Sequence, residues 1–174
     1  MKLFFVISVF ILSSVSFHSS VLARRSYKKP INLNISLKME LNRLLNEANE
    51  LHQVCADNKA VLIEARLKSL IGVIKDVKEK TKGTSGSKTH INKTLDQVQD
   101  QLETYLMVEP NSKQRKESLK EAFKQFVELA EVYNLDKYRI FFCSKDKSVW
   151  LQKSRSAKNP INPEKHLRCG RLVR

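Results

Sequence analysis

Glycine is scarce in this sequence of 174 residues: there are only four, and none belongs to a phosphate-binding loop or a dinucleotide fingerprint. Cysteine is rarer still, with three residues and no C-x-x-C pair, so the spacing is weak evidence for a metal site. After the first residues, no apolar run reaches transmembrane length. Acidic residues are outnumbered 18 to 32 by lysine and arginine. These deficits argue against a nucleotide-dependent enzyme and direct attention to charge and helical pattern.

The first 23 residues have the organisation of a secretory signal peptide. Lys2 precedes an apolar stretch at 3–12, and Val21 and Ala23 occupy the −3 and −1 places of a small-residue cleavage site. The alternative is an uncleaved membrane anchor, which is disfavoured because serines and a histidine interrupt the apolar run. We therefore expect a periplasmic or secreted protein with no transmembrane helix after signal cleavage.

Positive charge is concentrated at the two ends of the mature chain. The N-terminal tail, 24–33, carries four cations, and 137–174 carries eleven Lys or Arg against two acids, whereas 30–136 is neutral. A basic end can bind nucleic acid, anionic lipid or an acidic protein. Export argues against nucleic acid, which leaves an acidic protein or an anionic envelope surface. A solvated surface that only aids solubility is the alternative.

Four apolar stripes recur at steps of three and four residues, which is typical of amphipathic helices. They cover 37–55, 63–77, 91–106 and 119–133. The breaks between them are Asp57-Asn58, the loop sequence KGTSGSK and the sequence VEPNS, and we expect Thr89 to cap the third helix and Asn111 or Ser112 the fourth. Short connections favour antiparallel neighbours, so the sequence predicts an all-α, up-and-down four-helix bundle over 34–136.

The pattern changes in 137–174. The sequences YRIFFC and SVWLQ are aromatic and β-branched, and the polar SKDK between them indicates a turn, so a β-hairpin is predicted. A lone hairpin is marginally stable, and we expect it to pack on the bundle through Trp150 and either Phe141 or Phe142. Two Asn-Pro pairs and a Cys-Gly pair follow, which are typical of loops and turns.

The three cysteines allow one disulfide and leave one thiol. Cys55 lies on the first helical stripe, where cysteine behaves as a small hydrophobic residue. A Cys143–Cys169 disulfide would close a loop of about 27 residues and stabilise this apolar-poor segment by roughly 3 kcal/mol. The sharper alternative is a soft metal site formed by Cys143, His166 and Cys169, suited to Cu(I) or Zn. Unpaired or redox-active thiols are the third interpretation. We favour the disulfide.

Catalysis finds little support in the sequence. His52 and Cys55 are three residues apart on one helix, the proximity that a Cys/His nucleophile pair requires, but such a pair on an apolar stripe is usually structural. Glu128 and Glu131 belong to the polar face of the fourth predicted helix. We therefore expect a protein that is not an enzyme.

Several residues of the C-terminal segment stand in a recognisable order: Tyr138, Cys143, Trp150-Leu151, Asn159-Pro160 and Cys169-Gly170. In this order and spacing, the segment resembles the tail of an uncharacterised bacterial periplasmic domain of unknown function. That domain occurs as small exported proteins and attached to adaptor subunits of copper and other heavy-metal efflux pumps. The resemblance implies a helical accessory module at the cell envelope, with an efflux component as partner.

This sequence departs from that pattern where the pattern carries sulfur. The Pro-Met that often follows the first cysteine is replaced by Ser144-Lys145, and the methionine before the final Cys-Gly is replaced by Leu167-Arg168. The aromatic residue that follows Asn-Pro in that pattern is replaced by Ile161. If the domain uses thioether sulfurs to hold a soft metal, this chain has lost them. The retained cysteines, tryptophan, Asn-Pro and glycine form the set expected of a structural tail.

Two functional hypotheses result. The first is an exported, non-enzymatic binding or accessory module linked to copper or heavy-metal handling. The second is a structural protein that contacts an envelope protein or surface through a basic tail closed by a disulfide.

Overall fold

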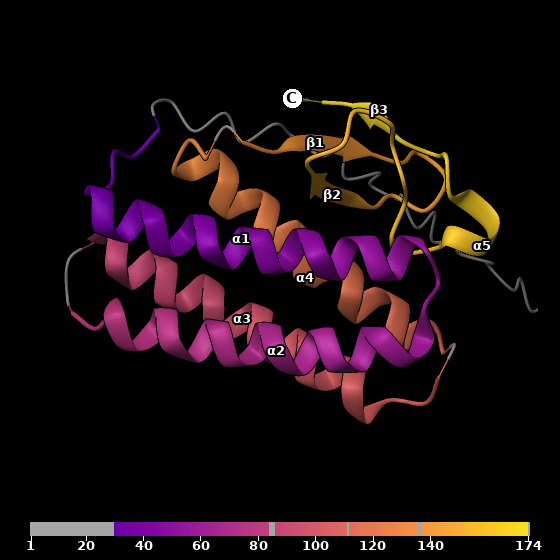
Figure 1. The fold of residues 1–174 in the computed structure, drawn as a ribbon, viewed down its shortest axis with the longest axis horizontal. Helices are drawn as coiled ribbons and strands as arrows, with labels where there is room; N and C mark the ends of the chain where they lie inside the picture. The colour runs from indigo at the N-terminus through magenta and orange to yellow at the C-terminus, as the bar shows by residue number, and fades with distance from the viewer. Residues whose placement is uncertain (1–29, 84–85, 111, 136, 174) are drawn as a thin grey trace, which may run out of the picture.

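Four helices and a small sheet make up the computed structural model, which describes residues 30–83, 86–110, 112–135 and 137–173 (Figure 1). The helices are α1 (Ile35–Ala56), α2 (Ala60–Lys80), α3 (Gly86–Met107) and α4 (Lys113–Val132). They run up and down with neighbours packed together, so the predicted fold class is confirmed. The predicted signal peptide and the cations of the N-terminal tail lie outside the described residues.

Side chains that satisfy the first free amides define two of the helix starts. The Asn34 side chain accepts a hydrogen bond from the amide of Leu37 at 2.9 Å, and Ser112 accepts one from the amide of Arg115 at 3.1 Å. The prediction for α3 is wrong, because this helix begins at Gly86 and Thr89 lies inside it. The carbonyl of Ser87 accepts a hydrogen bond from the Tyr133 hydroxyl at 3.1 Å, so a contact with α4 holds the extra turn.

The four apolar stripes meet in one core. Its largest fully buried side chains include leucines from α1 and α2, Ile91 and Leu95 from α3, and Phe123 and Phe126 from α4. Burial of these faces stabilises helices that would be marginal alone. Within the described ranges, no helix is long and apolar enough to cross a membrane.

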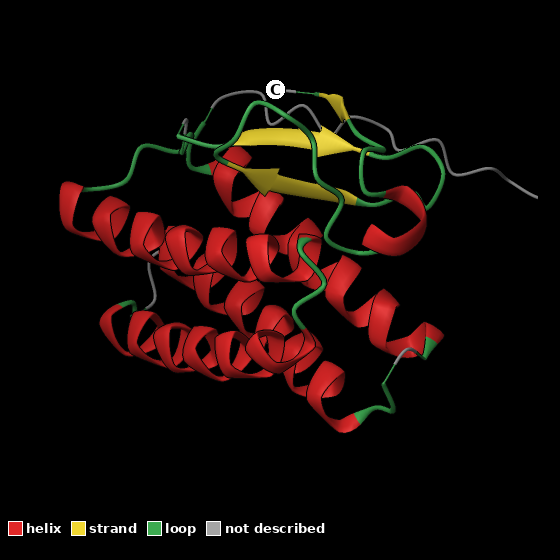
Figure 2. Cartoon of the chain, turned by 45° about the vertical axis from the view of Figure 1, so that its right-hand side comes forward, coloured by secondary structure: helices red, strands yellow, loops and turns green. Residues whose placement is uncertain are grey.

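The predicted hairpin is present and belongs to a three-stranded sheet. The strands are β1 (Arg139–Phe142), β2 (Val149–Gln152) and β3 (Arg171–Leu172), in the order β2-β1-β3 and antiparallel throughout. The sheet lies over α1 and α4, and α2 and α3 are on the far side of the bundle (Figure 2). Strand β3 and the short helix α5 (Pro163–His166) replace part of the expected loop.

One aromatic pair of the sheet belongs to the same buried core as the apolar faces of the helices. Phe141 lies opposite Trp150 in the strand register, and their rings are stacked with centroids 6.0 Å apart. Both side chains are buried, with Trp150 fully inaccessible. Phe142 is half-buried on the other side of β1, where the Arg171 guanidinium lies 5.6 Å from its ring. Of the two phenylalanines considered, Phe141 is therefore the one that packs with Trp150, because successive strand residues point to opposite faces.

Candidate functional site

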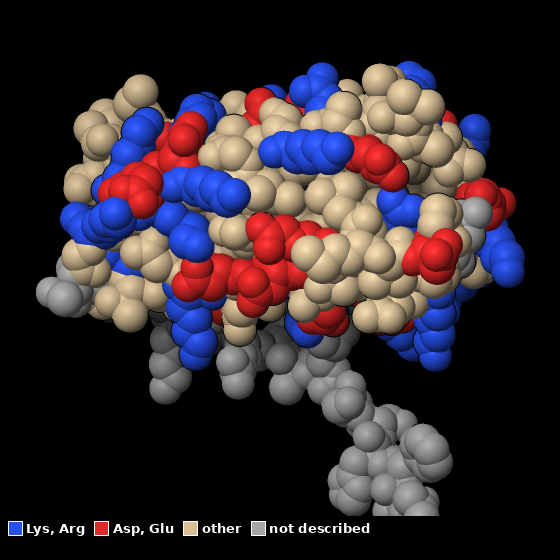
Figure 3. All heavy atoms as spheres, turned by 90° about the horizontal axis from the view of Figure 1, so that it is seen from below, with Lys and Arg blue, Asp and Glu red and all other residues tan. Residues whose placement is uncertain are grey.

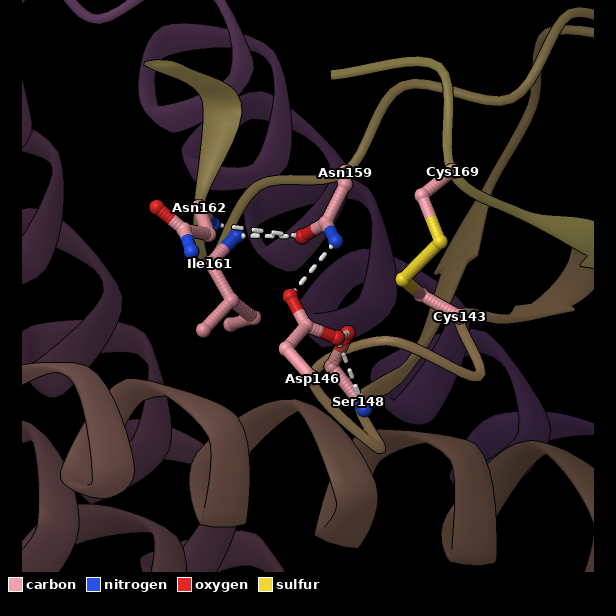
Figure 4. Close-up of a disulfide and its surroundings, with 7 residues drawn as sticks. All are labelled: Cys143, Asp146, Ser148, Asn159, Ile161, Asn162 and Cys169. Carbon is pink, nitrogen blue, oxygen red and sulfur yellow. Dashed lines mark hydrogen bonds between the residues drawn. A yellow bond between two sulfur atoms is a disulfide. The ribbon is translucent and has the colours of Figure 1, made fainter. Parts of the chain in front are cut away.

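The three predicted ligands and the structural tail residues all lie in the C-terminal segment, 137–173. Cys143 and Cys169 form a disulfide across it (Figure 4). Cys143 directly follows β1 and Cys169 precedes β3 by two residues, so the bond and the β1–β3 pairing hold the same two stretches together. The preferred pairing is confirmed. In this oxidised form neither sulfur is a thiolate, the form in which cysteine binds metals.

Two other potential ligands are not brought into a metal site. His166 ends α5, and no cluster of three or more His, Cys, Asp or Glu suited to a metal ion is found among the residues that the structure describes. Cys55 is a free thiol with 2% of its surface exposed. Burial raises the pKa of Cys55 to about 12, so this thiol stays protonated at neutral pH and is unsuited to nucleophilic attack.

Gly170 follows the disulfide because the site has no room for a side chain. A Cβ atom there would lie 2.8 Å from the Ala157 Cβ, 2.8 Å from Trp150 Cη2 and 3.0 Å from Trp150 Cζ2. Carbon atoms in contact are normally about 3.5–4.0 Å apart. The Cys-Gly pair is thus explained by the indole that lies against the backbone of Gly170.

Asn159 joins the hairpin turn to the following loop (Figure 4). Its side-chain amide donates to Asp146 Oδ2 at 2.8 Å, and its Oδ1 accepts from the amide of Ile161 at 2.8 Å. The other oxygen of Asp146 accepts from the Ser148 hydroxyl at 2.6 Å. Asn159 is fully buried and Pro160 is buried beside it, so the Asn-Pro motif holds the hairpin turn and the following loop together.

Trp150 and Tyr138 are also held by hydrogen bonds. The indole Nε1 of Trp150 donates to Gln152 Oε1 at 2.8 Å. The Tyr138 hydroxyl donates to Asn46 Oδ1 at 2.7 Å, which ties the start of the C-terminal segment to α1. Burial raises the pKa of Tyr138 to about 12, so the hydroxyl keeps its proton.

Helix α1 contributes two further anchors that sequence reasoning missed. Asn49 Oδ1 accepts a hydrogen bond from the amide of Lys153 at 3.0 Å. The His52 Nε2 lies 2.8 Å from the carbonyl oxygen of Lys158 and must be the donor, because a carbonyl only accepts. Burial lowers the pKa of His52 to about 4, so the ring is neutral. The sequence feature that could have predicted these anchors is the row of polar residues at 42, 46, 49 and 52, which lie on one side of the first helix.

The electrostatic character of the segment differs from that of the bundle. On the face away from the sheet, cations and acids are interspersed (Figure 3). Ion pairs within the bundle include Lys80–Glu40 at 2.6 Å and Lys124–Glu121 at 2.9 Å. The segment 137–173 has ten Lys or Arg and two acids, a net charge of +8. Lys158 pairs with Asp57 at 3.2 Å, and the other nine cations have no carboxylate partner among the described residues.

The two acids of the segment form hydrogen bonds with uncharged side chains and not with the cations of the segment. Asp146 is bound by Asn159 and Ser148, and Glu164 accepts from the Asn58 side chain at 3.4 Å. The disulfide gathers five exposed cations, each within four residues of a bridged cysteine: Lys145, Lys147, Lys165, Arg168 and Arg171. We refer to these five as the bridge cations. Covalent closure thus concentrates positive charge that has no carboxylate partner in the part of the chain that the structure describes.

No protein-family model, no curated protein and no solved structure matches this chain. The interpretation of the site therefore depends on its geometry and on the chemistry of its residues.

Proposed function

We propose that this protein is an exported, non-enzymatic interaction module that binds an acidic protein partner at the cell envelope through the bridge cations. The observation that carries the proposal is the disulfide, which fixes two basic stretches beside each other without a carboxylate partner among the described residues. Like charges held close together repel one another, and an acidic partner would relieve that repulsion.

An acidic protein is a better match than a lipid surface. The bridge cations lie on the hairpin turn, on α5 and the residues that follow it, and on β3, and the disulfide and the hydrogen bonds of Asn159 hold these stretches in fixed positions. Fixed charges suit a fixed arrangement of carboxylates. A fluid anionic membrane is recognised by basic segments that need no fold. The resemblance of the tail to domains attached to efflux adaptors makes an efflux component the first partner to test.

Charge reversal tests this proposal. The variant Lys145→Glu/Arg168→Glu should bind immobilised poly-glutamate at least about tenfold more weakly than the unmodified protein at low salt, because attraction becomes repulsion at two positions. The matched control is Lys68→Glu/Lys75→Glu, which makes the same change in net charge at exposed residues of α2. Equal weakening in both variants would show that only net charge matters and would contradict the proposal.

Binding experiments with lipid vesicles and with Cu(I) distinguish this proposal from an envelope-surface role and from metal handling. Binding to phosphatidylglycerol vesicles in preference to poly-glutamate, with the same dependence on the bridge cations, would favour an envelope surface over a protein. Stoichiometric Cu(I) uptake by the reduced protein, lost in Cys143→Ser, would favour the metal-handling function. The proposal predicts salt-sensitive binding to poly-glutamate by the oxidised protein, because exposed charges are screened by salt.

A further inference from the structure

A cavity of about 70 Å³ lies where one end of the bundle meets the C-terminal segment. Its lining includes the end of α1, the first turns of α2 and α4, the end of α3, and residues 160–164. None of the bridge cations lines it. Since about 10–15 Å³ is enough to hold one water molecule, the cavity has room for a ligand of several heavy atoms.

The cavity combines an apolar floor with a small polar rim. The floor includes the buried side chains of Ile63, Leu119 and Ile161. The charged residues of the rim are Arg115, Lys116 and Glu164, which together carry a net charge of +1. This combination of apolar walls and a few polar groups is typical of small-molecule sites, and the sign of the charge favours a monoanion.

Arg115 provides an unmatched donor. Its side chain is 11% exposed, its guanidinium lies 4.2 Å from the centre of the Tyr105 ring, and its Nη2 donates to Glu64 Oε1 at 3.3 Å. Its Nε is buried and has no hydrogen-bond partner among the described residues. Two other contacts therefore hold the guanidinium in place while one of its N–H groups is unused.

Asn162 provides an unmatched acceptor in the same lining. Its Oδ1 is also buried without a partner in the described part of the chain. Buried polar atoms are nearly always hydrogen-bonded, so a donor and an acceptor left over around one cavity indicate a missing group that can bond to both. A carboxylate oxygen would accept from Arg115, and a hydroxyl would donate to Asn162.

We propose that this cavity binds a small hydroxy-carboxylate. The carboxylate lies against Arg115 and Lys116, the hydroxyl meets Asn162, and the short carbon chain lies on the apolar floor. This site is separate from the bridge cations and goes beyond the protein-docking role proposed above.

Sodium glycolate is the probe, titrated into the oxidised full chain and followed by calorimetry and by amide NMR shifts. We expect saturable binding at one site, with acetate at least about tenfold weaker because it lacks the hydroxyl that Asn162 accepts from. No saturation with glycolate up to about 10 mM would show that water alone fills the cavity and would overturn the proposal. Equal binding of acetate would overturn the assignment of the hydroxyl.

Two variants locate the ligand. Arg115→Met should weaken glycolate binding at least about tenfold, because it removes a charge-assisted hydrogen bond. Arg168→Met, which removes the same charge outside the cavity, should leave binding unchanged. Asn162→Asp should also abolish glycolate binding, because its carboxylate repels that of the ligand. If Arg115→Met loses helical circular dichroism and is therefore misfolded, Asn162→Asp is the variant that tests the proposal. Unchanged glycolate binding in Asn162→Asp would overturn the proposal. The variant Lys145→Glu/Arg168→Glu should keep glycolate binding whatever its effect on poly-glutamate.

Discussion

Replacement of Gly170 by alanine tests whether the Cys-Gly motif exists for steric reasons. The new Cβ would lie at 2.8 Å from both Ala157 Cβ and Trp150 Cη2. Neither neighbour can move easily, because Trp150 is fully buried and stacked on Phe141, and the Ala157 methyl group has no alternative rotamer. The backbone around the disulfide must therefore shift.

Overpacking of this kind destabilises proteins by about 1–3 kcal/mol, and close contacts with two rigid neighbours place Gly170→Ala near the upper end. For a chain of this size, that corresponds to a fall in Tm of very roughly 5–10 °C. Equilibrium urea unfolding of the oxidised protein, followed by the fluorescence of its single tryptophan, measures the change. Trp150 emission also reports directly on the altered packing.

Gly72 supplies the matched control. It lies on the exposed side of α2, and a Cβ there would meet nothing within 4 Å. Gly72→Ala should therefore stabilise the protein by about 0.5–1 kcal/mol, because alanine is the better helix former. The double variant Ala157→Gly/Gly170→Ala should recover part of the lost stability. If Gly170→Ala changes the free energy of unfolding by less than about 0.5 kcal/mol, the steric explanation is wrong.

Other predictions concern the bonds that hold the C-terminal segment. The variant Cys143→Ser/Cys169→Ser should lose about 3–4 kcal/mol of stability through the opened loop of about 27 residues, measured in urea, and an unchanged midpoint would contradict this. His52 is neutral when folded and its pKa is lowered from 6.5 to about 4, so the unfolded chain binds its proton first as the pH falls. Its stabilising effect should be complete above about pH 6.5 and decrease by about 3 kcal/mol towards pH 4, a dependence that should be absent in His52→Gln. Asn159→Ala should cost about 2–3 kcal/mol, because it leaves Asp146 Oδ2 and the amides of Ile161 and Asn162 without their bonds to Asn159, and an effect no larger than that of replacing a surface asparagine would contradict this. A thiol assay in urea without reductant should find one thiol per chain, Cys55, and three would show that the disulfide is absent.

Much of the architecture was predictable from local pattern. The four helices follow from apolar residues at steps of three and four, and the hairpin follows from alternating aromatic and β-branched residues around a polar turn. The position of two cysteines within one apolar-poor segment, together with the predicted export, favoured the Cys143–Cys169 bond, which the structure contains. These features depend on neighbours in the sequence or on the composition of a short stretch.

Prediction from the sequence failed where contacts between residues far apart in the chain determine the local structure. The start of α3 was placed too late because the hydrogen bond from Tyr133 to Ser87 joins residues 46 apart. Residues 171–172 became a strand because the β1 edge and the disulfide bring them alongside Phe141 and Phe142. Local propensity in that stretch, Arg-Leu after Cys-Gly, indicates only a turn.

The sequence by itself determined a neutral helical body with a basic, disulfide-bearing end, because periodicity, composition and charge are properties of the chain alone. Only the tertiary structure decided what individual residues of that end, and of the helices that contact it, do. His52 binds a carbonyl 106 residues away, Gly170 makes room for the Trp150 ring, and Arg115 and Asn162 meet at one cavity. Such roles depend on distances of a few ångströms between segments far apart in the chain, and these distances are fixed only when the helices and the sheet pack together.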